Sequence, residues 1–77
     1  MKLKVLFFGK LADVTESDNL EMKNIFSIAE LINDLITKYP QLKNEQYKIA
    51  VNRKIENNNI GLIDGDEIAL LPPFAGG

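Results

Sequence analysis

The chain of 77 residues contains no cysteine and no histidine. Without cysteine there are no disulfides and no side-chain thiol chemistry. The lack of both residue types also excludes the usual structural zinc sites and a histidine general acid or base. If the protein takes part in a reaction, we therefore expect the reactive side chains on a partner. The stability of this one small domain must come from packed side chains, for which a hydrophobic content of 45% is sufficient.

Clusters of basic residues and long hydrophobic runs are also missing. Nine Lys and Arg residues are scattered among eleven Asp and Glu residues, and the net charge is −2. Nucleic-acid binding needs a concentrated positive surface, so we expect no nucleic-acid partner. The first apolar run ends by Gly9, far short of the roughly 18 residues that span a bilayer, and no signal-peptide cleavage site follows it. We therefore expect no membrane attachment and a cytoplasmic location.

The chain does have an unusual ending, in which a hydrophobic run stops at two prolines and two glycines follow. Pro72 and Pro73 lack a backbone N–H, so they end a strand and send the next residues away from it. Gly76 and Gly77 lack Cβ, so they fit a slot too narrow for any other residue, with the Gly77 carboxylate as the deepest group. An ordinary frayed end is the alternative. We interpret residues 72–77 as a flexible functional tail.

Alternating apolar side chains predict several strands. The predicted strands cover residues 2–8, 20–23, 48–52 and 67–71, with a short edge strand that starts at Ile55. The expected inward-facing residues are Leu3, Val5, Phe7, Ile49, Val51, Ile68 and Leu70. Residues 13–19, 52–54 and 64–66 are predicted to form loops or turns, because polar residues, Asn, Asp and Gly concentrate there.

One helix is predicted between the second and third strands. Ser27 and Glu30 have the spacing of a capping box, in which each side chain accepts the backbone N–H of the other residue. Phe26 is placed to pack on Leu31 as a hydrophobic staple. The apolar stripe of the helix consists of Ile28, Leu31, Ile32, Leu35, Ile36 and Tyr39. Pro40 ends the helix at or before the preceding residue.

The order of these elements favours an α+β fold. One helix is too few for a doubly wound fold, so a mixed sheet of four or five strands packed on one main helix fits best. We expect residues 1–71 to form this domain, with a right-handed crossover that lays the helix on one face of the sheet. The opposite face is then left for partners.

Three apolar residues are predicted on that opposite face. Phe8 and Leu71 follow the inward residues of the first and last strands, and Ile55 belongs to the edge strand. We interpret them as one contact surface for partners. The alternative for Phe8 and Ile55 is packing at the edge of the core, because single exposed apolar residues are common.

Four segments together are similar to a known family. They are residues 4–9, 50–52, 64–67 and 72–77. In this order they resemble the β-grasp, ubiquitin-like sulfur carriers, and most closely the small subunits of molybdopterin synthase. The Pro-Pro-x-x-Gly-Gly ending after Asp-Gly-Asp-Glu is the part that points to the molybdopterin branch, and Phe74 and Ala75 lie at positions that we expect to vary.

The resemblance implies a role in molybdenum cofactor biosynthesis. An ATP-dependent, E1-like adenylyltransferase would adenylate Gly77, and sulfur would then replace AMP to leave a C-terminal thiocarboxylate. The loaded tail would donate this sulfur to cyclic pyranopterin monophosphate in the large subunit, whose side chains supply the acids and bases. The small subunit would then be a non-catalytic sulfur donor, with no bound cofactor or metal, in a heterotetramer of two large and two small subunits.

The resemblance and the residue positions together suggest roles for individual residues. Gly77 would be the adenylation and thiocarboxylate site, and Gly76 would let the tail fit. The expected partner contacts are Phe8, Ile55, Leu71, Pro72, Pro73, Phe74 and Ala75. Other readings stay open: a sulfur carrier of the thiamine or tRNA-thiolation pathway, a ubiquitin-like modifier joined through Gly77 to lysines, or a binding module that ignores the terminus.

Overall fold

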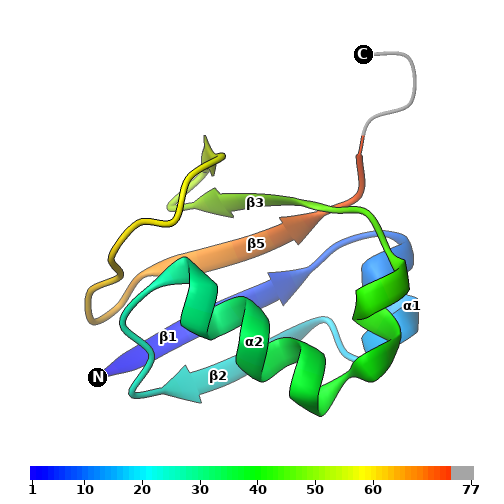
Figure 1. Ribbon diagram of the computed structural model, residues 1–77, viewed down its shortest axis with the longest axis horizontal. Coiled ribbons are helices and arrows are strands. Elements are labelled where there is room, and N and C mark those ends of the chain that lie inside the picture. Colours follow the sequence, from blue (N-terminus) through cyan, green and yellow to red (C-terminus); the bar gives the residue numbers. More distant parts are fainter. Residues whose placement is uncertain (74–77) are drawn as a thin grey trace.

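The computed structural model describes residues 1–73 and shows a five-stranded mixed sheet crossed by one main helix (Figure 1). The elements in chain order are β1 (Lys2–Phe7), α1 (Lys10–Thr15), β2 (Asn19–Lys23), α2 (Ile28–Lys38), the 3-10 helix η1 (Pro40–Asn44), β3 (Lys48–Val51), β4 (Lys54–Glu56) and β5 (Glu67–Leu71). The strand order across the sheet is β2-β1-β5-β3-β4. The predicted mixed sheet on one main helix is therefore confirmed.

The first and last strands lie side by side at the centre of the sheet. β1 and β5 are parallel, whereas every other pair of neighbouring strands is antiparallel. Phe7 is level with Leu70, and the Phe8 N–H donates to the Leu70 carbonyl over 3.1 Å. In a parallel pair the carboxyl ends of both strands meet at one edge of the sheet. The end of β1 therefore lies beside the point where the chain leaves β5.

The core lies between the sheet and α2, which runs in front of the strands in Figure 1. Alternate residues of β1 are buried, as the sequence predicts, and Ile28, Leu31 and Leu35 are the buried positions on α2. At the end of the helix, the Phe7 and Tyr39 rings pack edge to face with centroids 5.9 Å apart. Burial of these aliphatic and aromatic groups is the main source of stability in a chain without disulfides.

Two short helices were absent from the sequence prediction. The expected loop over residues 13–19 is wrong at its start, because Lys10–Thr15 forms α1, which buries Leu11 and Thr15. The Thr15 Oγ1 lies 3.0 Å from the carbonyl oxygens of Leu11 and Ser17, so this buried hydroxyl is satisfied. Similarly, η1 forms in a mostly polar stretch and buries Leu42. Both segments are too short to show helical periodicity.

The start of α2 differs in part from the predicted capping box. The Ser27 hydroxyl accepts the Glu30 N–H over 3.2 Å, as predicted. The Glu30 carboxylate, however, accepts the N–H of Phe26 over 3.4 Å rather than that of Ser27, one residue away from the expected donor. Phe26 is 56% exposed while Leu31 is buried, so the predicted staple is not a buried contact. The helix ends at Lys38, consistent with the stop at Pro40.

Candidate functional site

The face of the sheet that points away from α2 carries an apolar hollow. Because alternate side chains point to opposite faces, the buried residues of β1 face the core that they share with α2, and Leu6 lies on the outer face. The hollow has a volume of about 420 Å³ and is lined by Leu6, Phe8, Ala50, Arg53, Ile55, Glu67, Ala69 and Leu71. We call it the outer hollow. Its lining comes from β1, β3, β4 and β5 and from residues that adjoin them.

The structure brings the three predicted contact residues together in the outer hollow. Phe8 is 46% exposed and Ile55 is 41% exposed, so neither belongs to the core. Leu71 is half-buried and lines the same hollow at the end of β5. An apolar hollow with two large exposed hydrophobic side chains is a candidate surface for a protein partner. Binding of a partner at the outer hollow stays a prediction, and the geometry supports it.

Sequence reasoning did not assign a site role to several residues that line the hollow. Ala50 and Ala69 face each other across β3 and β5, where their small side chains leave room for the depression. Arg53 and Glu67 add one charge of each sign to an otherwise apolar lining. The alternation of side chains in β5, combined with the antiparallel register between β3 and β5, would have identified both alanines as part of the hollow.

A hydrogen-bonded turn fixes one side of the outer hollow. Asn52 and Arg53 connect β3 to β4 with φ angles of 50° and 72°, the positive values that a two-residue hairpin requires. The Asn52 side chain donates to Asp66 Oδ1 over 2.8 Å and accepts the Glu67 N–H over 3.0 Å. The other Asp66 oxygen accepts the Ile63 N–H over 2.9 Å. The hairpin that carries Arg53 is therefore attached to the turn before β5.

The tail begins directly beside the outer hollow. β5 ends at Leu71, and Pro72 and Pro73 continue from it along a second hollow of about 340 Å³. Lys10 and Glu45 form an ion pair of 3.3 Å within the lining of this second hollow. The remaining tail residues that were given roles from the sequence, Phe74, Ala75, Gly76 and Gly77, lie outside the described residues. Their roles, and the predicted flexibility of the tail, stay predictions.

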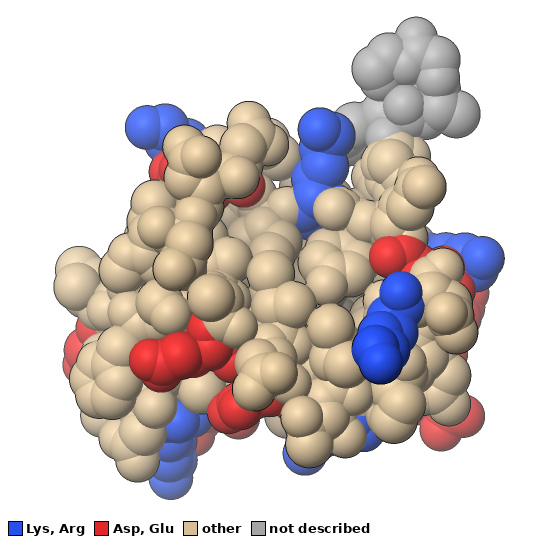
Figure 2. Space-filling model, in the orientation of Figure 1, with Lys and Arg blue, Asp and Glu red and all other residues tan. Residues whose placement is uncertain are grey.

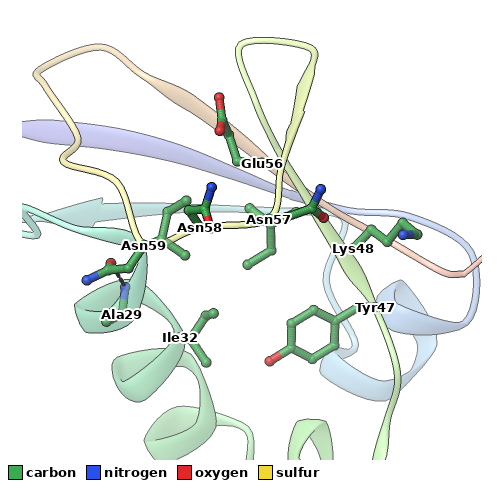
Figure 3. A pocket seen from close by; sticks show the side chains of 10 residues that line it. Ala29, Ile32, Tyr47, Lys48, Glu56, Asn57, Asn58 and Asn59 are labelled. Atoms are coloured by element: carbon green, nitrogen blue, oxygen red, sulfur yellow. Dashed lines mark hydrogen bonds between the residues drawn. The ribbon is translucent and has the colours of Figure 1, made fainter.

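A third hollow, of about 400 Å³, lies between α2 and the segment after β4 (Figure 3). Asn59 Oδ1 accepts the Ala29 N–H over 2.8 Å, so this segment caps an otherwise free N–H in the first turn of α2. Tyr47 lies across the hollow from the helix, and burial raises the pKa of its hydroxyl. The lining combines side-chain amides, Lys48 and Glu56 with apolar groups. The Asn59–Ala29 hydrogen bond attaches the 57–59 segment to the helix, and we assign no further role to this hollow.

Charges of both signs are mixed on one face of the molecule. On the face that carries α2, Lys and Arg are interspersed with Asp and Glu and no single-sign cluster stands out (Figure 2). Among residues 1–73, no helix is both long enough and apolar enough to cross a membrane.

Solved structures with the same fold cover the chain almost completely. A putative molybdopterin converting factor subunit 1 from Pyrococcus furiosus has a TM-score of 0.89 at 23% identity, over 96% of this chain and 99% of that one. SAMP1 from Haloferax volcanii has a TM-score of 0.83 at 20% identity, with both chains fully covered. These likenesses confirm the ubiquitin-like β-grasp fold. A complex of subunits 1 and 2 of molybdopterin-converting factor from Helicobacter pylori matches at 34% identity and a TM-score of 0.74, again over both full chains.

Sequence comparison gives the same family. The molybdopterin synthase sulfur carrier subunit of Mycobacterium tuberculosis is 35% identical over 82 aligned positions, which cover 100% of this chain and 99% of that protein. The subunit of the same name from Escherichia coli is 29% identical, over 97% of this chain and 99% of that protein. The model of the ThiS family matches residues 5–77, which include both the outer hollow and the tail. The chain therefore belongs to the ThiS family.

Proposed function

We propose that this chain is a sulfur-carrier subunit of molybdopterin synthase and that Gly77 carries the sulfur. The observation that carries the proposal is the junction of the outer hollow with the tail. Leu71 lines the hollow, and the next residue, Pro72, begins the tail. A partner that covers the outer hollow therefore receives the tail at its edge. The relatives named as molybdopterin synthase sulfur carrier subunits support this reading.

The chemistry of the carboxylate explains why activation is needed. A free carboxylate is a poor electrophile, because its charge is delocalised and oxide cannot leave. An E1-like adenylyltransferase would transfer AMP from ATP to the Gly77 carboxylate and release pyrophosphate. The terminal sulfur of a persulfide would then attack the acyl carbon and displace AMP. A thiol reductant would cleave the resulting acyl disulfide and leave the thiocarboxylate.

The loaded tail would then deliver its sulfur to the pterin precursor. In the active site of the large subunit, the thiocarboxylate sulfur would attack a carbon of cyclic pyranopterin monophosphate and displace the oxygen bound to that carbon. Hydrolysis of the acyl–sulfur bond would leave the sulfur on the pterin and return Gly77 to a carboxylate. Since the chain has no Cys or His, the acids and bases of this step would belong to the large subunit. Gly76 would permit entry into a narrow channel, because it has no Cβ.

Two partners would use the same surface in turn. The activating enzyme and the large subunit must each take hold of the domain and accept the tail, so both would cover the outer hollow. The complex of subunits 1 and 2 from Helicobacter pylori supports a large-subunit partner. We propose an assembly of two large and two small subunits in the cytoplasm.

Protein modification is a second candidate function. The small archaeal modifier protein SAMP1 of Methanosarcina acetivorans has a TM-score of 0.81 at 25% identity and covers 99% of this chain. A modifier would be activated in the same way, but a lysine amine rather than a persulfide would take the Gly77 acyl group. Carriers of the thiamine and tRNA-thiolation pathways share the diglycine and would differ only in the acceptor of the sulfur.

Intact mass spectrometry tests the proposal. The chain is incubated with ATP, a sulfide source and the E1-like activator, and its mass is recorded before and after addition of the large subunit and pterin precursor. We expect a mass rise that matches one oxygen replaced by sulfur, and its loss only when the precursor is present. An unchanged mass with a competent activator contradicts the carrier role, and higher-mass conjugates on a gel would indicate the modifier.

A further inference from the structure

Gly9 lies against the first proline of the tail. In the parallel pair of β1 and β5, Phe7 is level with Leu70, and Gly9 and Pro72 each follow two residues further along their own segment. A methyl group on the Gly9 Cα would lie 3.1 Å from Cγ of Pro72 and 3.8 Å from its Cδ. Carbon atoms pack best at about 3.5–4.0 Å. A side chain at position 9 would therefore press on the proline ring, which would have to move by a few tenths of an ångström.

The backbone at Gly9 also requires glycine. Its φ and ψ are 57° and −133°, and the Leu11 N–H donates to the Phe8 carbonyl over 3.1 Å. These features are those of a type II′ turn, whose first central position is taken by glycine. The turn carries the chain from the end of β1 into α1, so the glycine Cα remains at the edge of the sheet, where Pro72 packs on it.

We propose that Gly9 is a positioning residue for the tail. Its bare Cα lets the Pro72 ring lie against the end of β1, and this contact sets the direction in which the following residues leave the sheet. Pro72 cannot extend the ladder of β5, because it has no N–H, and its φ is held by its own ring. Contact with Gly9 therefore orients a stiff residue at the root of the tail. The inference rests on the proposed function, since it concerns how Gly77 is delivered.

A small change of direction at Pro72 would be amplified at the terminus. Five residues follow Pro72, and fully extended they would span at most about 17 Å. With that reach, a tilt of about 10° at Pro72 would move the terminal carboxylate by about 3 Å. A misplacement of about 1 Å at a reacting centre can slow a reaction by about 100-fold. Gly9 would thus influence the sulfur-transfer rate without contact with the sulfur.

Gly65 provides a matched control for Gly9. It also has a positive φ, 86°, but a Cβ there would meet no atom within 4 Å. Gly9→Ala and Gly65→Ala both introduce backbone strain, and only Gly9→Ala pushes on the tail. At a temperature where both variants are folded, we expect Gly9→Ala to lower kcat for sulfur transfer by about 10–100-fold with an unchanged Kd for the large subunit. Gly65→Ala should transfer sulfur at the wild-type rate. Equal rates for the two variants would overturn the proposal.

A second substitution tests the contact itself. Pro72→Ala removes Cγ and Cδ, the two atoms that a methyl on Gly9 would meet. The double variant Gly9→Ala, Pro72→Ala should therefore transfer sulfur faster than the additive losses of the single variants predict. If the rate loss in the double variant equals the sum of the losses in the single variants, expressed as free energies, the proposed contact between Gly9 and Pro72 is contradicted. If Gly9→Ala does not fold, Pro72→Ala is compared with Pro73→Ala, and a loss no larger at Pro72 than at Pro73 would overturn the proposal.

Failure of the proposed function would give a different result. In that case the wild-type chain gains no sulfur from a competent activator. If only the positioning role is wrong, the wild-type chain loads and transfers sulfur normally, and Gly9→Ala behaves like Gly65→Ala.

Discussion

The side-chain amide of Asn52 donates to the buried carboxylate of Asp66 over 2.8 Å and joins the β3–β4 hairpin to the turn before β5. The same amide accepts the Glu67 N–H, and the Asn52 N–H donates to the Glu67 carbonyl over 2.8 Å. One residue thus makes three hydrogen bonds while its backbone has a positive φ, which asparagine tolerates better than most residues.

We predict that Asn52→Ala lowers the free energy of unfolding by about 2–3 kcal/mol, because it removes the hydrogen-bond donor to Asp66 Oδ1 and places alanine at positive φ. Urea unfolding followed by circular dichroism measures the change. Asn58→Ala is the matched control, since the Asn58 side chain is exposed and makes no hydrogen bond among the described residues. A similar loss in both variants would show that the Asn52 network contributes nothing specific.

Phe8→Glu should weaken binding of the large subunit by about 2 kcal/mol or more without lowering Tm. The reason is that the 46% exposed ring of Phe8 lines the outer hollow, where a carboxylate would be buried by a partner. Phe26→Glu is the control, because Phe26 is 56% exposed and does not line the hollow. Isothermal titration calorimetry gives both affinities, and a large drop in Tm for Phe8→Glu would instead place Phe8 in the core.

Gly76→Ala, or one extra residue after Gly77, should abolish sulfur loading or transfer and leave Tm unchanged. A Cβ at position 76 would not fit a channel that admits only glycine, and an added residue would displace the reactive carboxylate. Intact mass after incubation with activator and large subunit separates loading from transfer. Normal formation and turnover of the thiocarboxylate in these variants would refute the narrow-channel argument.

Stability should fall with rising pH in the alkaline range because of Tyr47. Burial raises the pKa of its hydroxyl above the usual value, so the folded protein retains this proton where the unfolded chain has lost it. The contribution is complete below the unfolded pKa of about 10 and is lost as pH rises through the folded pKa. Urea unfolding at several alkaline pH values measures the slope. Tyr47→Phe should reduce it, and an unchanged slope would assign the effect to other groups.

The parts of the fold that the sequence predicted are those with long or strongly patterned segments. Alternation in β1 and β5 identified the inward residues, and the Ser27 cap with its apolar stripe located α2. The short helices α1 and η1 were missed because six and five residues cannot display a helical period, and tertiary burial of Leu11 and Leu42 holds them in place.

The candidate site was predictable only in part, for a related reason. Phe8, Ile55 and Leu71 stand out as apolar residues on the outer face of individual strands. The contribution of Ala50 and Ala69 depends on the register between β3 and β5, which no single segment contains. The contact between Gly9 and Pro72 likewise requires the parallel pairing of the first and last strands.

That pairing has a consequence for biosynthesis. β5 lies between β1 and β3, so a ribosome must deliver nearly the entire domain before its central strand can be inserted. A chain cut short before Glu67 would lack the middle of the sheet, and its β1 would have no parallel neighbour. Truncated chains would then stay unfolded, so proteases would degrade them and they would not compete for the partner. The domain can therefore fold only when β5, the strand that leads directly into the tail, has been synthesised.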